Sequence, residues 1–159
     1  MKKLIALHSR HIYLKPGEIV VAYEPTLVSS VLGSCVAVTM FSPARRIGAI
    51  CHAMLPHSDG RGDDLRYVDS AVQHIFQKMR ACGVTDLVVK MFGGAQVLDV
   101  GSYAPEKRTV GAQNVLQAEL ALEALGLKVS AQDTGGIHGR KLYFCTREGD
   151  VFLHRMGRK

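Results

Sequence analysis

Two residues in the first third of the chain, Cys35 and His52, have the side chains needed for nucleophilic catalysis. Only a few per cent of a free thiol is thiolate at neutral pH, and an adjacent imidazole can take the thiol proton. The same imidazole can later protonate an amine leaving group. A third polar side chain usually orients the imidazole, and Ser29, in the small-residue loop before Cys35, is the candidate. We therefore predict a catalytic group of Cys35, His52 and Ser29.

The two residues belong to two apolar runs, 36–41 and 47–55, separated by a turn sequence that contains Pro43. If this turn is centred just after Pro43, Cys35 lies directly opposite His52 on the same face of a hairpin. Opposed residues in an antiparallel pair lie about 4.5–5.5 Å apart at Cα, which suits a thiol–imidazole pair. The expectation depends on the register, because a bulge or an odd-length loop would move the side chains apart.

Ordinary packing is a competing interpretation, because buried cysteines are common and usually inert. A metal site is another, since Cys51 and His57 lie close to Cys35 and His52 in the sequence. Adjacent residues on a strand point to opposite faces, which separates Cys51 from His52. The spacing also lacks the paired ligands of a structural zinc site, so we predict no bound metal.

Small and polar residues surround the predicted nucleophile. Gly33 and Ser34 form a turn before the strand and would leave Cys35 with little steric cover. His57 begins a polar, glycine-containing loop at 57–64 that could reach a substrate. We expect Gly33, Ser34 and His57 to contact substrate. Further along, Gly93-Gly94 either exposes N–H groups to the site or makes a tight turn after a strand.

The hydrophobic pattern predicts a scaffold of mixed α/β type. Both hairpin runs are almost wholly apolar, which is typical of strands covered on both faces. Apolar residues recur at helical spacing from Leu65 to Met79, and Gly83 follows this helix. We expect about six or seven strands and two helices, in layers, within one domain spanning residues 1–159. Strands are expected near 18–23, 36–41, 47–55, 86–92, 128–132, 141–146 and 151–154, and the second helix near 111–125.

The composition is that of a globular protein and narrows the choice of partners. Of 159 residues, 47% are hydrophobic and 21% charged, and the longest apolar runs are far too short to span a bilayer. The net charge of +6 favours acidic partners, but the basic residues are scattered and only 6% of residues are aromatic, so we expect no nucleic-acid binding. The apolar run 4–7 ends at His8, too early for a signal peptide. The four cysteines include no C-x-x-C pair, so we expect reduced thiols and a cytoplasmic protein.

Several short runs along the chain match one family in order. They are Leu32–Val36, Cys51–Pro56 with His52, Arg66–Asp69, Met91–Ala95, Gly111–Val115, and Asp133–Gly136 followed by Gly139-Arg140. Together they resemble the CheD family of chemoreceptor glutamine deamidases and cover nearly the whole chain from about His11. Each run alone is weak, but the ordered set is a specific signal.

The resemblance implies a three-layer α/β/β sandwich, with mostly antiparallel strands and helices packed on the outside. It implies that Cys35 is the nucleophile and His52 the base, and it puts Ser29 where the family usually has Thr. No metal or cofactor is implied. The 133–140 segment is a family loop that either contacts the site or only connects two strands.

The implied activity is hydrolysis of specific glutamine side-chain amides on cytoplasmic chemoreceptor helices, through a Cys-thioester, in chemotaxis adaptation. The products are glutamate and ammonia, and some relatives also hydrolyse glutamate methyl esters. The implied partners are the chemoreceptor and a CheC-type response-regulator phosphatase. The alternative is a non-catalytic binding module that regulates such a phosphatase or binds receptors. The presence of both Cys35 and His52 favours the enzyme.

Overall fold

The computed structural model describes residues 4–5, 7–60, 62–96 and 108–157. Within these ranges, no helix is both long and apolar enough to cross a membrane. The strands are β1 (His11–Tyr13), β2 (Ile19–Ala22), β3 (Leu27–Leu32), β4 (Val36–Ser42), β5 (Ile47–Ala53), β6 (Val88–Gly93), β7 (Val129–Thr134), β8 (Arg140–Cys145) and β9 (Val151–Arg155). The long helices are α2 (Val68–Ala81) and α3 (Val110–Ala124).

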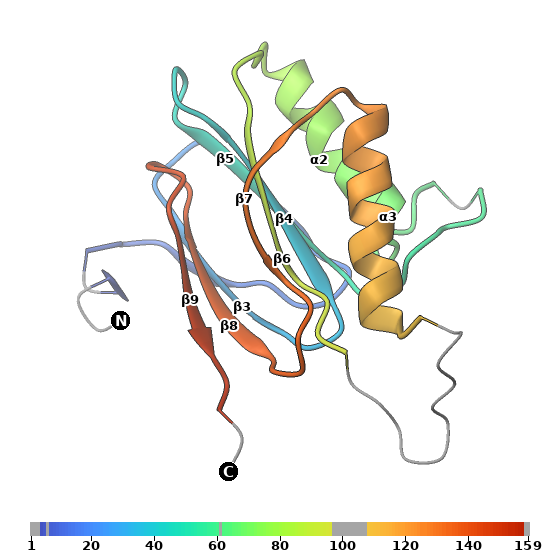
Figure 1. Cartoon of the computed structure of the whole chain (residues 1–159). Coiled ribbons are helices and arrows are strands. Elements are labelled where there is room, and N and C mark those ends of the chain that lie inside the picture. Colours follow the sequence, from blue (N-terminus) through green and yellow to red (C-terminus); the bar gives the residue numbers. More distant parts are fainter. Residues whose placement is uncertain (1–3, 6, 61, 97–107, 158–159) are drawn as a thin grey trace.

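Two β-sheets and a pair of helices form three layers. The five-stranded sheet has the order β2-β5-β4-β6-β7, and the four-stranded sheet has the order β1-β3-β8-β9. The β6–β7 and β1–β3 pairs are parallel and the other pairs are antiparallel. Both helices pack on one face of the five-stranded sheet, and the four-stranded sheet covers the other face (Figure 1). The expected α/β/β sandwich is therefore confirmed.

Two apolar clusters fill the spaces between the layers. The helix-side cluster includes Val38, Ile75 and Met79, and the inter-sheet cluster includes Ile50 and Phe144. Strands β4 and β5 are buried along their whole length because each face packs on a different layer, as their apolar runs predicted. Each large apolar side chain buried here contributes about 1.5–3 kcal/mol. The two clusters therefore fix the faces of the strands on which the candidate residues lie.

Strand β3 is the main difference from the predicted elements. Its residues were expected to belong to the small-residue loop before Cys35. They instead form a strand between β1 and β8, in which Val28 and Leu32 face the inter-sheet cluster. Strand β1 was also missed, since three residues are too few to show a pattern. The other predicted elements agree with the structure to within a few residues.

Candidate active site

The β4–β5 hairpin carries the two predicted catalytic residues on neighbouring strands. Its pairing puts His52 opposite Ala37, so the expected pairing of Cys35 with His52 is wrong by two residues. The physical reason is the turn, which has four residues rather than two. It ends with Arg46 in the left-handed region, at φ 53°, and the Arg46 N–H donates to the Ser42 carbonyl at 2.8 Å.

The observed register still leaves Cys35 and His52 on one face. A shift of two residues preserves the face, because side chains alternate along a strand with a period of two. Cys35 packs against the inter-sheet cluster, which also holds Ile50, the residue two before His52. Cys51 belongs to the helix-side cluster, as predicted. Cys35 and His52 therefore lie on one face near the same end of the hairpin, with Cys35 one residue before its paired part.

The imidazole of His52 is buried between the sheets and is held through one nitrogen. Its Nδ1 lies 2.7 Å from Oγ of Ser30 in the opposite sheet, and this hydroxyl donates to the Leu14 carbonyl at 2.7 Å. Because the hydroxyl proton is used on Leu14, Ser30 Oγ accepts from Nδ1–H. That tautomer leaves a lone pair on Nε2, which has no hydrogen-bond partner among the described residues. Nε2 is therefore available as a base.

It is Ser30, and not Ser29, that contacts the imidazole. The two serines are adjacent on β3, so their side chains point to opposite faces of the sheet. Ser30 shares the inner face with Val28 and Leu32, whereas Ser29 takes the outer face. The assignment of Ser29 to the imidazole is therefore corrected by one residue. It treated the segment as a loop, in which neighbouring side chains do not alternate.

Burial sets the protonation states of both groups. Burial raises the pKa of the Cys35 thiol, and its own backbone N–H offsets only part of this. Burial lowers the pKa of His52, and the Leu14 carbonyl and Glu18 carboxylate offset part of this. Both directions favour the uncharged forms. A resting thiolate–imidazolium pair is therefore disfavoured at this position.

The other cysteines lie in different surroundings, and all four carry free thiols. Burial raises the pKa of Cys51 to about 12 and that of Cys145 to about 11. The Cys82 sulfur lies 3.2 Å from the hydroxyl of Tyr23. In the part of the chain that the structure describes, no group of three or more His, Cys, Asp or Glu side chains could hold a metal ion. Cys35 differs from the other thiols in lying on the His52 face of the hairpin.

Backbone hydrogen bonds from the end of β6 fix the loop that carries Cys35, which we call the nucleophile loop (residues 33–35). The N–H of Gly94 donates to the Cys35 carbonyl at 2.8 Å, and that of Ala95 donates to the Gly33 carbonyl at 2.9 Å. Gly93 has φ 105°, and a Cβ there would overlap the Cys35 carbonyl oxygen, so only glycine fits. The Gly93-Gly94 pair is thus a turn packed on the nucleophile loop, and the Gly94 N–H is engaged rather than free for substrate.

Asn114 on α3 holds the same loop, although it carried no role in the predictions from sequence. Its side chain is fully buried, and Nδ2 donates to the carbonyls of Ser34 at 2.9 Å and Met54 at 3.2 Å. Met54 lies just beyond β5, two residues after His52. This one amide therefore joins the segments of Cys35 and His52. A polar residue within an apolar stretch of a helix was the signal that could have marked it.

The 133–140 segment closes this end of the sandwich. The nearly buried Arg140 donates to the Asp133 carboxylate at 2.8 Å, to the Gly135 carbonyl at 2.7 Å and to the Gly93 carbonyl at 3.2 Å. Through Gly93 the segment lies against the nucleophile loop. Of the two expectations for it, a contact with the site surroundings fits better than a simple connection between strands.

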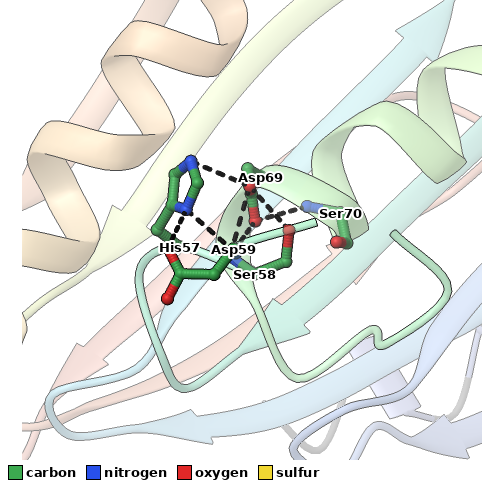
Figure 2. A network of polar contacts seen from close by, with 5 residues as sticks. All are labelled: His57, Ser58, Asp59, Asp69 and Ser70. Carbon is green, nitrogen blue, oxygen red and sulfur yellow. Dashed lines mark hydrogen bonds and ion pairs between the residues drawn. The ribbon is translucent and has the colours of Figure 1, made fainter. Parts of the chain in front are cut away.

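The residues expected to contact substrate lie in two places. Gly33 and Ser34 belong to the nucleophile loop, whereas His57 belongs to a separate polar network after β5 (Figure 2). The His57 Nδ1 lies 3.0 Å from a carboxylate oxygen of Asp59, and its Nε2 lies 3.6 Å from one of Asp69. Both ring nitrogens of His57 therefore face carboxylates of its own surroundings. A substrate contact for Gly33, Ser34 and His57 remains a prediction.

The chain is similar to one known protein family and to several proteins of that family. A family model described as CheD, "CheD chemotactic sensory transduction", matches residues 54–155. A protein of Geobacter sulfurreducens named "Probable chemoreceptor glutamine deamidase CheD 2" is 48% identical over 151 residues, which cover 93% of this chain and 91% of that protein. A "Probable chemoreceptor glutamine deamidase CheD" of Maridesulfovibrio salexigens is 46% identical over 158 residues, with 92% of each chain covered. One of Nitratidesulfovibrio vulgaris is 36% identical over 169 residues, covering 98% of this chain and 82% of that protein.

Proposed function

This chain belongs to the CheD family, and on that premise we propose that it is a chemoreceptor glutamine deamidase. The proposed reaction hydrolyses the side-chain amide of specific receptor glutamines to glutamate and ammonia, in chemotaxis adaptation. The names of the relatives support the substrate class. The observation that carries the chemistry is the free Nε2 of His52, on the same face as Cys35, with Nδ1 committed to Ser30.

In the first step, the Cys35 sulfur attacks the carboxamide carbon while the thiol proton moves to Nε2 of His52. The attack and the proton transfer are coupled, because burial disfavours both the thiolate and the imidazolium at rest. The Ser30 hydroxyl keeps the imidazole in the tautomer that can accept this proton. The backbone N–H of Cys35, which already acts on its own thiol, is our candidate donor to the oxyanion.

In the second step, the His52 imidazolium gives its proton to the amide nitrogen, and the carbon–nitrogen bond breaks to release ammonia. A thioester on Cys35 remains. A water molecule then loses a proton to Nε2 and attacks the thioester carbon, and the carbon–sulfur bond breaks to leave glutamate. The imidazole returns the proton to the sulfur, so the cycle balances with water as the only co-reactant. A glutamate methyl ester would pass through the same thioester, with methanol as the leaving group.

We also propose a cellular location and a protein partner for the reaction. The proposed location is the cytoplasm, which the receptor substrate and the four free thiols support. A CheC-type response-regulator phosphatase is the proposed protein partner. Its binding is tested by adding the purified phosphatase and measuring inhibition, with Cys35→Ala as the binding control that lacks turnover.

The direct test is intact-mass measurement of a receptor cytoplasmic fragment after incubation with this protein, with ammonia assayed in parallel. We expect a Gln-to-Glu mass increase and matching ammonia with the wild type, and neither with Cys35→Ala. An equal change with both proteins would remove Cys35 from the mechanism. Binding of the fragment without any mass change would favour the non-catalytic binding module instead.

A further inference from the structure

Asn114 lies where α3 meets the segments that carry the proposed nucleophile and base. Helix α3 packs closely against the backbone after β6 at this point. A Cβ on Gly111 would overlap the Ala95 carbonyl, and one on Gly94 would overlap a methyl group of Val115. Helix α3 thus packs directly on the backbone that hydrogen-bonds to the nucleophile loop. A side chain in this part of the helix can therefore hold the nucleophile loop in one position.

The two carbonyls that Asn114 contacts lie just beyond the paired part of the hairpin. The β4–β5 ladder ends at Val36 opposite Ala53, so Ser34 and Met54 have left it. Cys35 also lies outside the ladder, and strand pairing therefore does not set its distance from the base. The Asn114 amide bridges this gap, because Nδ2 donates to one carbonyl on each side. Two carbonyl acceptors within reach of one amide atom also identify that atom as the nitrogen.

The oxygen atom of the Asn114 amide makes no comparable hydrogen bond to the described residues. This atom, Oδ1, is buried and has no hydrogen-bond partner among them. A buried, half-satisfied amide lowers the stability of a fold, and an apolar side chain of similar size would avoid that loss. The bridge made by Nδ2 is therefore what accounts for an amide at this position.

We propose that Asn114 is a positioning residue that sets the separation between the Cys35 sulfur and Nε2 of His52. It touches neither the substrate nor the reacting atoms, and it acts by holding the two backbone segments in one arrangement. Displacement by about 1 Å can lower a rate by roughly a hundredfold, so loss of the bridge should reduce turnover far more than substrate affinity.

The chain offers a matched control for this proposal. Asn114→Asp removes both donated hydrogen bonds with almost no change of shape, and Gln113→Glu makes the same amide-to-carboxylate change one residue away. The Gln113 side chain is exposed and donates to the Arg108 carbonyl at 2.9 Å. Asn114→Ala removes the bridge without adding charge, and Asn114→Ser keeps one donor. Circular dichroism and thermal melting establish that each variant is folded.

The kinetic arm rests on the proposed function. With the receptor fragment, we expect Asn114→Asp and Asn114→Ala to lower kcat by about 10–100-fold and to change KM by less than about threefold. Asn114→Ser should fall between them and the wild type, and Gln113→Glu should stay within about twofold of it. A rise in KM with kcat unchanged, or an equal loss in Gln113→Glu, would overturn the proposal.

A second arm needs no substrate, so it distinguishes failure of this inference from failure of the proposed function. Iodoacetamide labels Cys35, with Cys35→Ala as the blank, and the rate is followed against pH. In the wild type we expect reaction near neutral pH that His52→Gln abolishes, because it depends on the imidazole. In Asn114→Ala we expect the neutral-pH rate to drop about tenfold and to recover only as the isolated thiol ionises.

The double variant completes the test. Asn114→Ala should cause no further loss in a His52→Gln background, because both changes remove the same assistance. An unchanged alkylation profile in the folded Asn114 variants overturns the positioning role, even if the wild type is an active deamidase. Conversely, a shifted profile supports the role even if no deamidation is found.

Discussion

Both faces of the β4–β5 strands are buried among apolar side chains, but a histidine lies only on the inter-sheet face. The helix-side face presents Cys51 among apolar side chains, and burial there raises the thiol pKa to about 12. The inter-sheet face presents Cys35 and His52, whose imidazole is tied by Ser30 to the opposite sheet. Burial alone therefore makes an inert thiol. A reactive one also needs a polar partner whose free lone pair lies on the same face.

The largest expected effect comes from making one change on each face. Cys35→Ser should lower kcat/KM by at least about 1,000-fold, because a neutral hydroxyl is a far weaker nucleophile than a thiol. Cys51→Ser should keep activity within about threefold but lower the free energy of unfolding by about 1–3 kcal/mol, because it buries a hydroxyl among apolar groups. Deamidation kinetics and urea unfolding measure both. A folded Cys51→Ser protein without activity would show that the two faces are not functionally distinct.

The next effect compares two histidines at the same end of the hairpin. His52→Gln should lower kcat by about 100–10,000-fold, since it removes the proposed base and acid. His57→Gln should change kcat by less than about threefold, because both ring nitrogens of His57 face carboxylates (Figure 2). The same fragment assay compares the pair. A substrate contact of His57 would appear in KM, whereas a large loss of kcat in His57→Gln would show that His57 takes part in the chemical step.

A smaller effect distinguishes the faces of β3. Ser30→Ala leaves the Nδ1–H of His52 without its acceptor, so kcat should fall by about tenfold. Ser29→Ala, on the other face of the same strand, should change kcat by less than about twofold. Measuring kcat for deamidation with both variants at one pH tests this difference. If Ser29→Ala were the slower enzyme, Ser29 would be the orienting group after all.

The smallest effect is on stability against pH. Because burial lowers the pKa of His52 below its ordinary 6.5, the unfolded chain binds a proton there more readily than the folded chain does. This contribution to the free energy of unfolding is complete above pH 6.5 and is lost as the pH falls through the folded value. Urea unfolding of the wild type and His52→Gln at several pH values should show a shallower loss on acidification in the variant. Parallel curves would mean that His52 titrates alike in both states.

Much of the scaffold could be predicted because its signals are local. The apolar runs of β4 and β5 gave strands covered on both faces, and helical spacing gave α2. The residue types and the shared face of Cys35 and His52 also followed from the sequence. The pairing register of β4 with β5 could not be predicted. The length of the turn depends on the left-handed conformation of Arg46, which no local sequence pattern indicates.

The rest of the site depends on partners that are distant in sequence. The contact of Ser30 with the imidazole was not predicted, because two adjacent serines do not indicate a strand. Only in a strand do their side chains point to opposite faces, which directs Ser30 into the space between the sheets. The role of Asn114 was not predicted, because its two carbonyl acceptors lie 80 and 60 residues away along the sequence. A buried amide in a helix signals that a partner exists, but only the tertiary structure tells which one it is.

Those long separations also bear on the order of events during synthesis. The strands that carry Cys35 and His52 leave the ribosome early, whereas the amide that bridges their ends follows only with α3. A nascent or partly folded chain can therefore pair β4 with β5 while the nucleophile loop still lacks its last restraint. On the positioning role proposed for Asn114, competence for deamidation follows only after most of the chain has been made.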